Sequence, residues 1–306
     1  MNICPICKSS DEKLIKNSFL PKFRYCAACG GHFLIGEELP FYPEEYFSEI
    51  SEPSSVAKAA APILSFFYRL RVNKIKKLLK NKSNPKILDY GCGTGKLIQM
   101  LSEEKITVVG FEPSEGARQI AARKNLPVYG EVKTAEGGYD LIMFWHSLEH
   151  TDKPFEVVKK AKEYLSQDGK LLIAVPNADS FEARISKEKW FHYDYPFHRV
   201  QFASKALEIM LQKLGFSIEV IDFFCPEYTI SGLIQTFLNF CLPKNVFYSV
   251  VSNRRINMNR RGAVLMSLFS LVLVLFFSPF LILLFTATLI FRRTGAMVIV
   301  AKKTQA

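Results

Sequence analysis

The sequence predicts an α/β fold in which helices cover both faces of a mostly parallel β-sheet. Three observations indicate this fold. Short apolar segments alternate with segments of helical composition from Lys86 onward, a glycine-rich turn joins the first strand to its helix, and an acidic residue ends the second strand. With 306 residues, the chain has room for a full hydrophobic core and about two domains.

The individual elements follow from their composition and from the residues that end them. Before the sheet, apolar residues recur at helical spacing over 56–81, until Asn84-Pro85 stops the pattern. Short apolar runs predict strands at 86–90, 106–112, 127–129, 139–145, 169–176, 216–224 and 295–303. Longer mixed segments predict helices at 96–104, 115–125, 154–167 and 204–215.

The turn after the first strand reads "LDYGCGTG", from Leu88 to Gly95. Glycines at this place allow a tight turn and let the backbone approach a ligand beside the N-terminus of the next helix. Glu112 ends the second strand 21 residues after Gly91, where a carboxylate can accept hydrogen bonds from ribose hydroxyls. The pattern therefore predicts a nucleotide-like ligand at the carboxyl ends of the first two strands.

These residues, with "YDLIMFWHSLEH" in the fourth strand, resemble the class I S-adenosylmethionine-dependent methyltransferases over about 85–225 and 295–303. The resemblance implies a Rossmann-like seven-stranded sheet whose last strand runs antiparallel. It also implies that the glycine loop holds the methionine end of S-adenosylmethionine, that Glu112 holds the ribose, and that the segment after Val128 covers the adenine. The implied cofactor-binding residues are Asp89, Tyr90, Gly91, Cys92, Gly93, Gly95, Glu112, Pro113 and Glu131. A nicotinamide cofactor fits less well, because the glycines are spaced GxGxG and not GxGxxG.

Methyl transfer to a hydroxyl requires a base, and histidines cluster after the fourth and fifth strands. His146, His150 and His198 are the candidate catalytic residues, with Glu149 and His192 nearby. "HSLEH" also matches an inverted zinc-protease pattern, but that site requires a helix and this segment begins where a strand ends. The ubiquinone-biosynthesis O-methyltransferases, which the segment resembles more closely, have Glu-x-x-Glu-His there and can use a divalent metal. Alternatively, Glu149 and His150 only cap the next helix.

Aromatic residues follow the fifth strand. Trp190, Tyr193 and Tyr195 suit either the wall of a substrate pocket or core packing.

Two CxxC pairs near the N-terminus predict a structural metal site. Cys4, Cys7, Cys26 and Cys29 can bring four thiolates to one tetrahedral zinc, and such a closed site stabilises a small module without catalysing a reaction. In this prediction His32 is a surface residue. Cys92, Cys225 and Cys241 are expected to be buried apolar residues.

An uncharged run of 29 residues, 263–291, has the composition of a membrane segment. If 295–303 is the last strand of the sheet, both ends of the run lie on the same side of the membrane. We therefore expect a re-entrant helical hairpin that turns at Pro279, with a single tilted span as the alternative. The preceding segment, 229–251, suits either the membrane interface or a lid over the substrate cleft.

The charge distribution supports the membrane interpretation. The net charge is +11, and nine basic residues but no acidic ones follow Glu227. Because these cations flank the apolar run, anionic headgroups on the cytoplasmic face are expected partners and nucleic acid is not. The N-terminus has no apolar stretch typical of a secretory signal.

We thus expect a membrane-anchored methyltransferase at the cytoplasmic face of the cell membrane, which acts on a small-molecule or lipid-linked acceptor, such as a glycan intermediate or a prenylated quinone. An RNA methyltransferase and a non-catalytic membrane scaffold are the alternatives. The expected organisation is a zinc ribbon over 1–50, a helical linker over 51–84, the cofactor-binding domain over 85–225, a membrane-associated insertion over 226–294, and the final strand and tail over 295–306.

Overall fold

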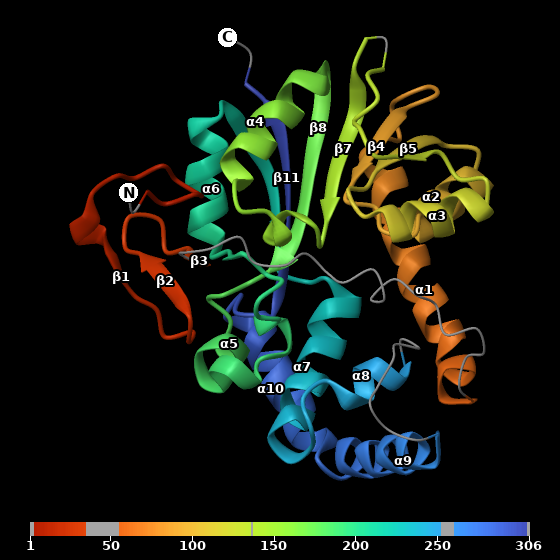
Figure 1. Cartoon of the computed structure of the whole chain (residues 1–306), viewed down its shortest axis with the longest axis vertical. Helices are drawn as coiled ribbons and strands as arrows, with labels where there is room; N and C mark the ends of the chain where they lie inside the picture. Colours follow the sequence, from red (N-terminus) through yellow and green to blue (C-terminus); the bar gives the residue numbers. More distant parts are fainter. Residues whose placement is uncertain (1–2, 35–54, 136, 252–259, 305–306) are drawn as a thin grey trace.

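The main body of the protein is a seven-stranded sheet in the order β10-β11-β8-β7-β4-β5-β6 (Figure 1). This computed structural model describes residues 3–34, 55–135, 137–251 and 260–304. The strands are β4 (Lys86–Tyr90), β5 (Thr107–Phe111), β6 (Val128–Tyr129), β7 (Tyr139–Trp145), β8 (Leu165–Pro176), β10 (Phe216–Asp222) and β11 (Ala296–Lys303). β11 pairs antiparallel with both β8 and β10, whereas β4 to β8 are parallel. This arrangement confirms the predicted fold class.

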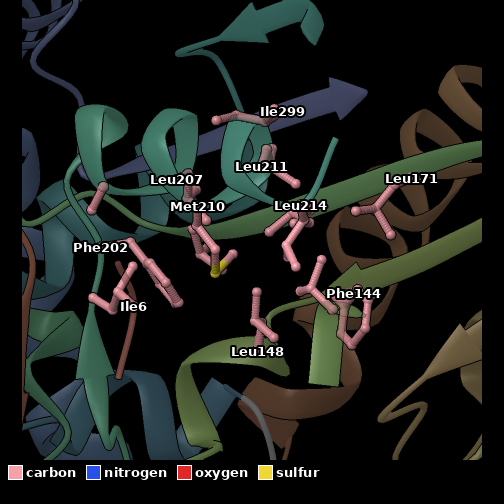
Figure 2. Close-up of a cluster of buried hydrophobic side chains, with 14 of the residues drawn as sticks. Ile6, Phe144, Leu148, Leu171, Phe202, Leu207, Met210, Leu211, Leu214 and Ile299 are labelled. Atoms are coloured by element: carbon pink, nitrogen blue, oxygen red, sulfur yellow. The ribbon is translucent and has the colours of Figure 1, made fainter. Parts of the chain in front are cut away.

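Helices cover both faces of this sheet, because its strands alternate apolar side chains between two cores. On one face, Leu171 and Ile299 meet Leu207, Met210 and other residues of α6 (Ser204–Lys213), as Figure 2 shows. α4 (Pro154–Tyr164) belongs to the same core. On the other face, strand residues such as Met143 pack against α1 (Ser55–Leu78) and α2 (Lys96–Glu103). α3 (Glu115–Arg123) packs near β6.

The N-terminal module packs against the main body and shares a small sheet with it. β1 (Ile15–Asn17), β2 (Phe23–Cys26), β3 (His32–Leu34) and β9 (Val200–Gln201) form one antiparallel sheet. His32 is therefore buried, and its Nδ1 lies 2.7 Å from the Ser18 hydroxyl. The expectation that His32 lies on the surface was wrong, because the rings of Phe19 and Tyr25 pack against it, with centroids 5.0 and 5.1 Å away. Residues 35–50 of the expected zinc ribbon lie outside the described residues.

Between β10 and β11 the chain forms a helical insertion. It consists of α7 (Pro226–Cys241), α8 (Val246–Val251), α9 (Arg260–Phe276) and α10 (Ser278–Ile290). Figure 1 shows these helices beyond the carboxyl end of β7, and α5 (Phe181–Ser186) beside them. The chain then returns to the sheet through Thr294, whose carbonyl accepts a hydrogen bond from the Asn177 side chain at 3.0 Å.

The apolar run is divided by a break at Phe277. Pro279 lies in the first turn of α10, where its missing N–H costs nothing, so a new helix begins there. Within the described residues, no single helix is long and apolar enough to cross a bilayer. Val264–Phe276 and Ser278–Ile290 satisfy that test only as a pair, and they are bent by 70°. The two helices of the run thus meet at an elbow.

Candidate active site

A first pocket lies where β4 and β7 end, and we call it the glycine-loop pocket. Its volume is about 150 Å³. The residues that line it are Tyr68, Arg71, Asp89, Gly91, Cys92, Gly93, Thr94, Lys96, Leu97 and Trp145. Of the expected cofactor-binding residues, Asp89, Gly91, Cys92 and Gly93 therefore share one cavity.

The glycines of the loop have backbone conformations that other residues rarely adopt. Gly91, Gly93 and Gly95 have φ angles of +80°, +57° and +75°. A Cβ atom on Gly91 would lie 2.5 Å from the Cβ of Ser147, so this position excludes a side chain for steric reasons as well. Gly95 immediately precedes α2, which places backbone N–H groups of the helix N-terminus toward the loop.

Asp89 is the acidic group of the pocket. Burial raises the pKa of its carboxyl to about 7, although the Arg71 guanidinium acts in the opposite direction. A carboxylate in this environment gains from an ammonium group beside it, which is the group that the methionine end of S-adenosylmethionine carries. The acid and the glycine cradle thus suit the methionine end of this cofactor.

Glu112 holds the glycine loop from the second strand. One carboxylate oxygen accepts a hydrogen bond from the Gly93 N–H at 2.8 Å, and the other accepts one from the Ser114 N–H at 2.9 Å. Glu112 is buried beside the loop, where the remaining lone pair of each carboxylate oxygen can still accept a hydrogen bond from a ribose hydroxyl.

Of the five expected cofactor residues outside the lining of this pocket, Gly95 and Glu112 belong to or hold the glycine loop, whereas Tyr90, Pro113 and Glu131 do not. Glu131 and Pro113 are exposed. The Tyr90 ring packs against Phe111 and Phe144, with centroid distances of 4.5 and 4.7 Å. Its ring therefore belongs to the core, because alternate residues of a strand point to opposite faces.

The contribution of α1 was not predicted from the sequence. This helix, expected to be only a linker, places Tyr68 and Arg71 in the glycine-loop pocket. The Arg71 Nε lies 2.6 Å from Glu227 of α7, and Trp145 donates a hydrogen bond to the same carboxylate at 3.2 Å. Helical spacing alone could not identify Arg71, because its function depends on where α1 packs.

A second pocket, of about 180 Å³, contains four of the five histidines, and we call it the histidine pocket. Its lining residues are His146, Glu149, His150, Phe191, His192, Asp194, His198, Tyr228, Asn245, Tyr248 and Ser249. The two pockets are neighbours: Trp145 lines the first and His146 the second. Tyr228 of α7 and Tyr248 and Ser249 of α8 make the insertion one wall of the histidine pocket.

His146 and Glu149 form a pair in this pocket. The Nδ1 of His146 lies 3.2 Å from a carboxylate oxygen of Glu149, and its ring stacks on Tyr228 with centroids 3.5 Å apart. His146 has φ +53°, a conformation that costs energy outside glycine and is common at functional sites. Its Nε2 is buried and has no hydrogen-bond partner among the residues that the structure describes. Burial, with Arg71 nearby, keeps the pKa of His146 well below its ordinary value, so the ring is neutral.

The other two candidate histidines contact backbone carbonyls. His150 Nδ1 lies 3.1 Å from the Phe197 oxygen, and His198 Nδ1 lies 2.8 Å from the His192 oxygen. Glu149, His150 and His198 each offer one potential metal-ligand atom, and these atoms lie within 4.8 Å of one another. Oε1 of Glu149 lies next to His146 and orients that ring, whereas its Oε2 is buried and has no hydrogen-bond partner among the described residues.

This arrangement agrees with the comparison to known proteins. A family model described as "Methyltransferase domain" matches residues 65–220, about half of the chain. The chain belongs to this methyltransferase family. With its strand order and glycine loop, it is a class I S-adenosylmethionine-dependent methyltransferase.

The methyltransferase is similar to curated enzymes over part of its length. It is 28% identical over 123 residues to the ubiquinone biosynthesis O-methyltransferase of Haemophilus ducreyi, covering 35% of this chain and 52% of that protein. With the enzyme of the same name from Escherichia fergusonii it shares 30% over 103 residues, covering 30% and 43%. The chain thus spans about half the length of the curated relatives it matches.

Solved structures with a similar fold include the cyclase SpnF, at 14% identity and a TM-score of 0.49, with 78% of this chain and 81% of that chain covered. A SAM-dependent methyltransferase from Archaeoglobus fulgidus has 19% identity and a TM-score of 0.46, with 77% and 94% covered. Both similarities are of fold alone.

The aromatic residues that follow β8 divide between core and surface in this methyltransferase. Trp190 and Tyr193 are buried in a small cluster with Leu20 and Phe23 of the N-terminal module, and Tyr195 is exposed. The histidine pocket instead takes its aromatic wall from Phe191, Tyr228 and Tyr248. Core packing is therefore the correct interpretation for Trp190 and Tyr193.

The four N-terminal cysteines converge in the interior of their module. Cys4 Sγ lies 3.8 Å from Cys29 Sγ, and Cys7 Sγ lies 3.7 Å from Cys26 Sγ. All four are buried, and their sulfurs lie within 4.8 Å of one another. A regular tetrahedron with Zn–S bonds of about 2.3 Å has sulfurs about 3.8 Å apart, so the donor set fits zinc. Of the other three cysteines, Cys225 is buried, Cys92 is half-buried, and Cys241 is exposed, against expectation.

Proposed function

We propose that this methyltransferase transfers a methyl group from S-adenosylmethionine to a hydroxyl group of a small-molecule acceptor. The observation that carries the proposal is the His146–Glu149 pair, which faces a pocket next to the glycine loop. Asp89, the glycine-loop backbone and Glu112 would hold the cofactor, with Tyr68 and Arg71 covering it from α1. When bound there, S-adenosylmethionine supplies an activated methyl group on a sulfonium.

The protein's own contribution is alignment and removal of one proton. Glu149 accepts the Nδ1 hydrogen of His146, which fixes the tautomer with its lone pair on Nε2. Nε2 can then accept the proton of an acceptor hydroxyl in the histidine pocket. Tyr228 stacks on the ring and restricts its rotation, and the buried surroundings exclude water.

We further propose that the acceptor is lipid-linked and that the enzyme works at the cytoplasmic face of the cell membrane. A cavity of about 180 Å³ admits only a ring-sized part of a larger molecule. One wall of that cavity belongs to the insertion that carries the apolar elbow. A glycan intermediate and a prenylated quinone both meet these requirements. No Lys or Arg is among the residues described as lining the histidine pocket, which argues against an RNA acceptor.

Calorimetry and isotope transfer test this function. The full chain should bind S-adenosylmethionine at one site. In what we call the lipid assay, it should transfer tritium from methyl-labelled S-adenosylmethionine into membrane lipids extracted from the source organism. Failure to bind S-adenosylmethionine would support a non-catalytic scaffold, and label recovered in added RNA instead of lipid would support an RNA methyltransferase.

We also propose that Cys4, Cys7, Cys26 and Cys29 hold a structural zinc that stabilises the wall of the histidine pocket. The module is joined to that wall by the Tyr193 hydroxyl, which donates a hydrogen bond to the Pro21 carbonyl at 2.7 Å. On the other side, Lys213 donates a hydrogen bond to the Cys7 carbonyl at 2.7 Å. The metal would therefore act through packing and not in the reaction.

Replacing Cys26 with serine should remove the zinc and lower the melting temperature by roughly 10 °C, if a few kcal/mol of stability are lost. In a Trp145→Phe background the remaining tryptophan, Trp190, should shift its emission to the red, because it packs against the module. Metal content by mass spectrometry and a thermal scan provide the measurements. Cys241→Ser, at an exposed position, is the matched control and should change neither. Full stability without bound metal would contradict the proposal.

A further inference from the structure

The last two helices of the insertion between β10 and β11 expose large apolar side chains, and α9 buries polar ones. On α9, Ser267 and Ser270 are 5% and 0% exposed. Leu265, Leu268 and Leu275 on the same helix are 66%, 55% and 63% exposed. A helix at the surface of a water-soluble protein normally buries its apolar face, so the polarity of α9 is inverted.

α10 also exposes large apolar side chains, although it buries Leu281 as well as Thr288. Thr288 is 1% exposed, whereas Ile282, Leu283 and Ile290 are 64%, 70% and 72% exposed. The two helices thus present a continuous series of large apolar side chains, a feature that marks an interaction surface.

The interior of the insertion is held by a polar network. The Gln235 amide donates a hydrogen bond to Asn239 at 2.8 Å, and Asn239 donates one to Asn245 at 3.1 Å. The Tyr248 N–H donates to Gln235 at 2.7 Å, which attaches α8 to α7. Small or polar contacts inside and apolar side chains outside are typical of helices that face lipid.

The first half of α1 extends this apolar surface. Ile63 and Phe66 are 59% and 56% exposed, and Leu64 is 37% exposed. α8 contacts both α1 and α9, so it lies between them. Figure 1 shows α8, α9 and the start of α1 at the same end of the molecule, beyond the carboxyl end of β7. We call the exposed apolar residues of α1, α9 and α10 the three-helix surface.

Charge indicates the partner of this surface. α1 contains no acidic residue but includes Lys58 and Arg69, and no acidic residue follows Glu227. Arg292 and Arg293 follow α10 after Phe291, and Arg293 lies 3.4 Å from Asp179. A large apolar surface with cations and without anions is complementary to an anionic lipid leaflet, whose headgroups attract Lys and Arg.

We propose that the three-helix surface lies in one leaflet of an anionic bilayer and that α1 is part of this membrane contact. α9 and α10 have 17 and 13 residues, so their lengths are about 26 and 20 Å, both shorter than a hydrocarbon core of about 30 Å. Their 70° bend also prevents them from crossing as one rod. Because α8 carries Tyr248 and Ser249 of the histidine pocket, that pocket then lies at headgroup level. The entry of a lipid-linked acceptor from the leaflet rests on the proposed function; the membrane contact itself does not.

Vesicle sedimentation tests the contact with the full chain. It should pellet with vesicles of phosphatidylcholine and phosphatidylglycerol, and less with phosphatidylcholine alone. Phe66→Asp on α1 and Leu268→Asp on α9 should each weaken binding by about tenfold or more, since each removes a large apolar side chain and adds a repelled charge. Ile185→Asp is the matched control, because Ile185 is 71% exposed on α5, outside the three-helix surface. This variant should bind the vesicles as the unchanged chain does.

Each outcome has a distinct meaning. Unchanged binding by the Leu268 variant would overturn the proposal, and unchanged binding by the Phe66 variant alone would remove α1 from the contact. If the chain bound a soluble protein but no vesicles, the three-helix surface would be a site for a protein partner and not for a membrane. S-adenosylmethionine affinity is measured on the same samples to show that each variant is folded. A chain that binds vesicles but not S-adenosylmethionine would refute the proposed function and leave the three-helix surface standing.

Discussion

Replacing Gly91 with alanine should weaken S-adenosylmethionine binding by at least about thirtyfold. A residue with a Cβ pays roughly 1–2 kcal/mol for a left-handed conformation, and 1.4 kcal/mol is a factor of ten in affinity. Gly91 has φ +80°, and its added Cβ would also lie 2.5 Å from the Cβ of Ser147. The loop of the free protein can relax, but the conformation that holds the cofactor cannot accept the methyl group, so the cost falls on binding. Calorimetric titration measures it.

Gly137→Ala is the matched control for this substitution. Gly137 has a similar φ of +73°, but a Cβ there would have no neighbour within 4 Å, and the residue lines neither pocket. The affinity of this variant for S-adenosylmethionine should stay within about twofold of that of the unchanged chain. Equal losses in both variants would mean that general destabilisation and not the glycine cradle causes the effect.

Replacing His146 with alanine should lower turnover in the lipid assay by about 10²- to 10⁴-fold, the usual contribution of a general base. The Nε2 of His146 has no hydrogen-bond partner among the described residues and can take the acceptor's proton, and alanine removes it. S-adenosylmethionine affinity should change by no more than about twofold, since His146 does not line the glycine-loop pocket. Initial rates and calorimetry on the same preparation separate the two effects.

Glu149→Gln and His150→Ala indicate whether this assignment is correct. Glutamine can still accept the His146 hydrogen bond but stabilises a protonated ring less. The turnover of the Glu149→Gln variant should therefore lie between that of the unchanged chain and that of the His146 variant. His150 contacts the Phe197 carbonyl, so its replacement by alanine should lower turnover by less than about tenfold. A larger loss for the His150 variant than for His146→Ala would move the base to His150.

The strands and the glycine loop were predictable because their signals are local. β4 and β7 have the predicted bounds, since each is a short apolar run with a clear end. The boundary between α4 and β8 was not predictable: the helix ends at Tyr164 and not at 167, and the strand begins at Leu165. Leu165 pairs with Tyr139 of β7, and this long-range pairing overrides the helical composition of the segment.

The candidate site was predictable only as a set of residue types. Spacing placed Asp89 and the glycine loop at the end of β4, and the structure puts them in one pocket. It could not show that His146 would be paired with Glu149 and stacked on Tyr228, which is 82 residues away. It also could not predict that Arg71 would lie against Glu227 across 156 residues.

By itself, the sequence determined the sheet, the cofactor loop, the cysteine cluster and the presence of an apolar insertion, because each depends on residues that are close along the chain. The tertiary structure decided which faces of the helices meet. It made α1 a wall of the cofactor pocket, turned the polar side of α9 inward and brought four histidines into one cavity. These outcomes depend on packing between distant segments, and neither composition nor periodicity specifies which segments will pack together.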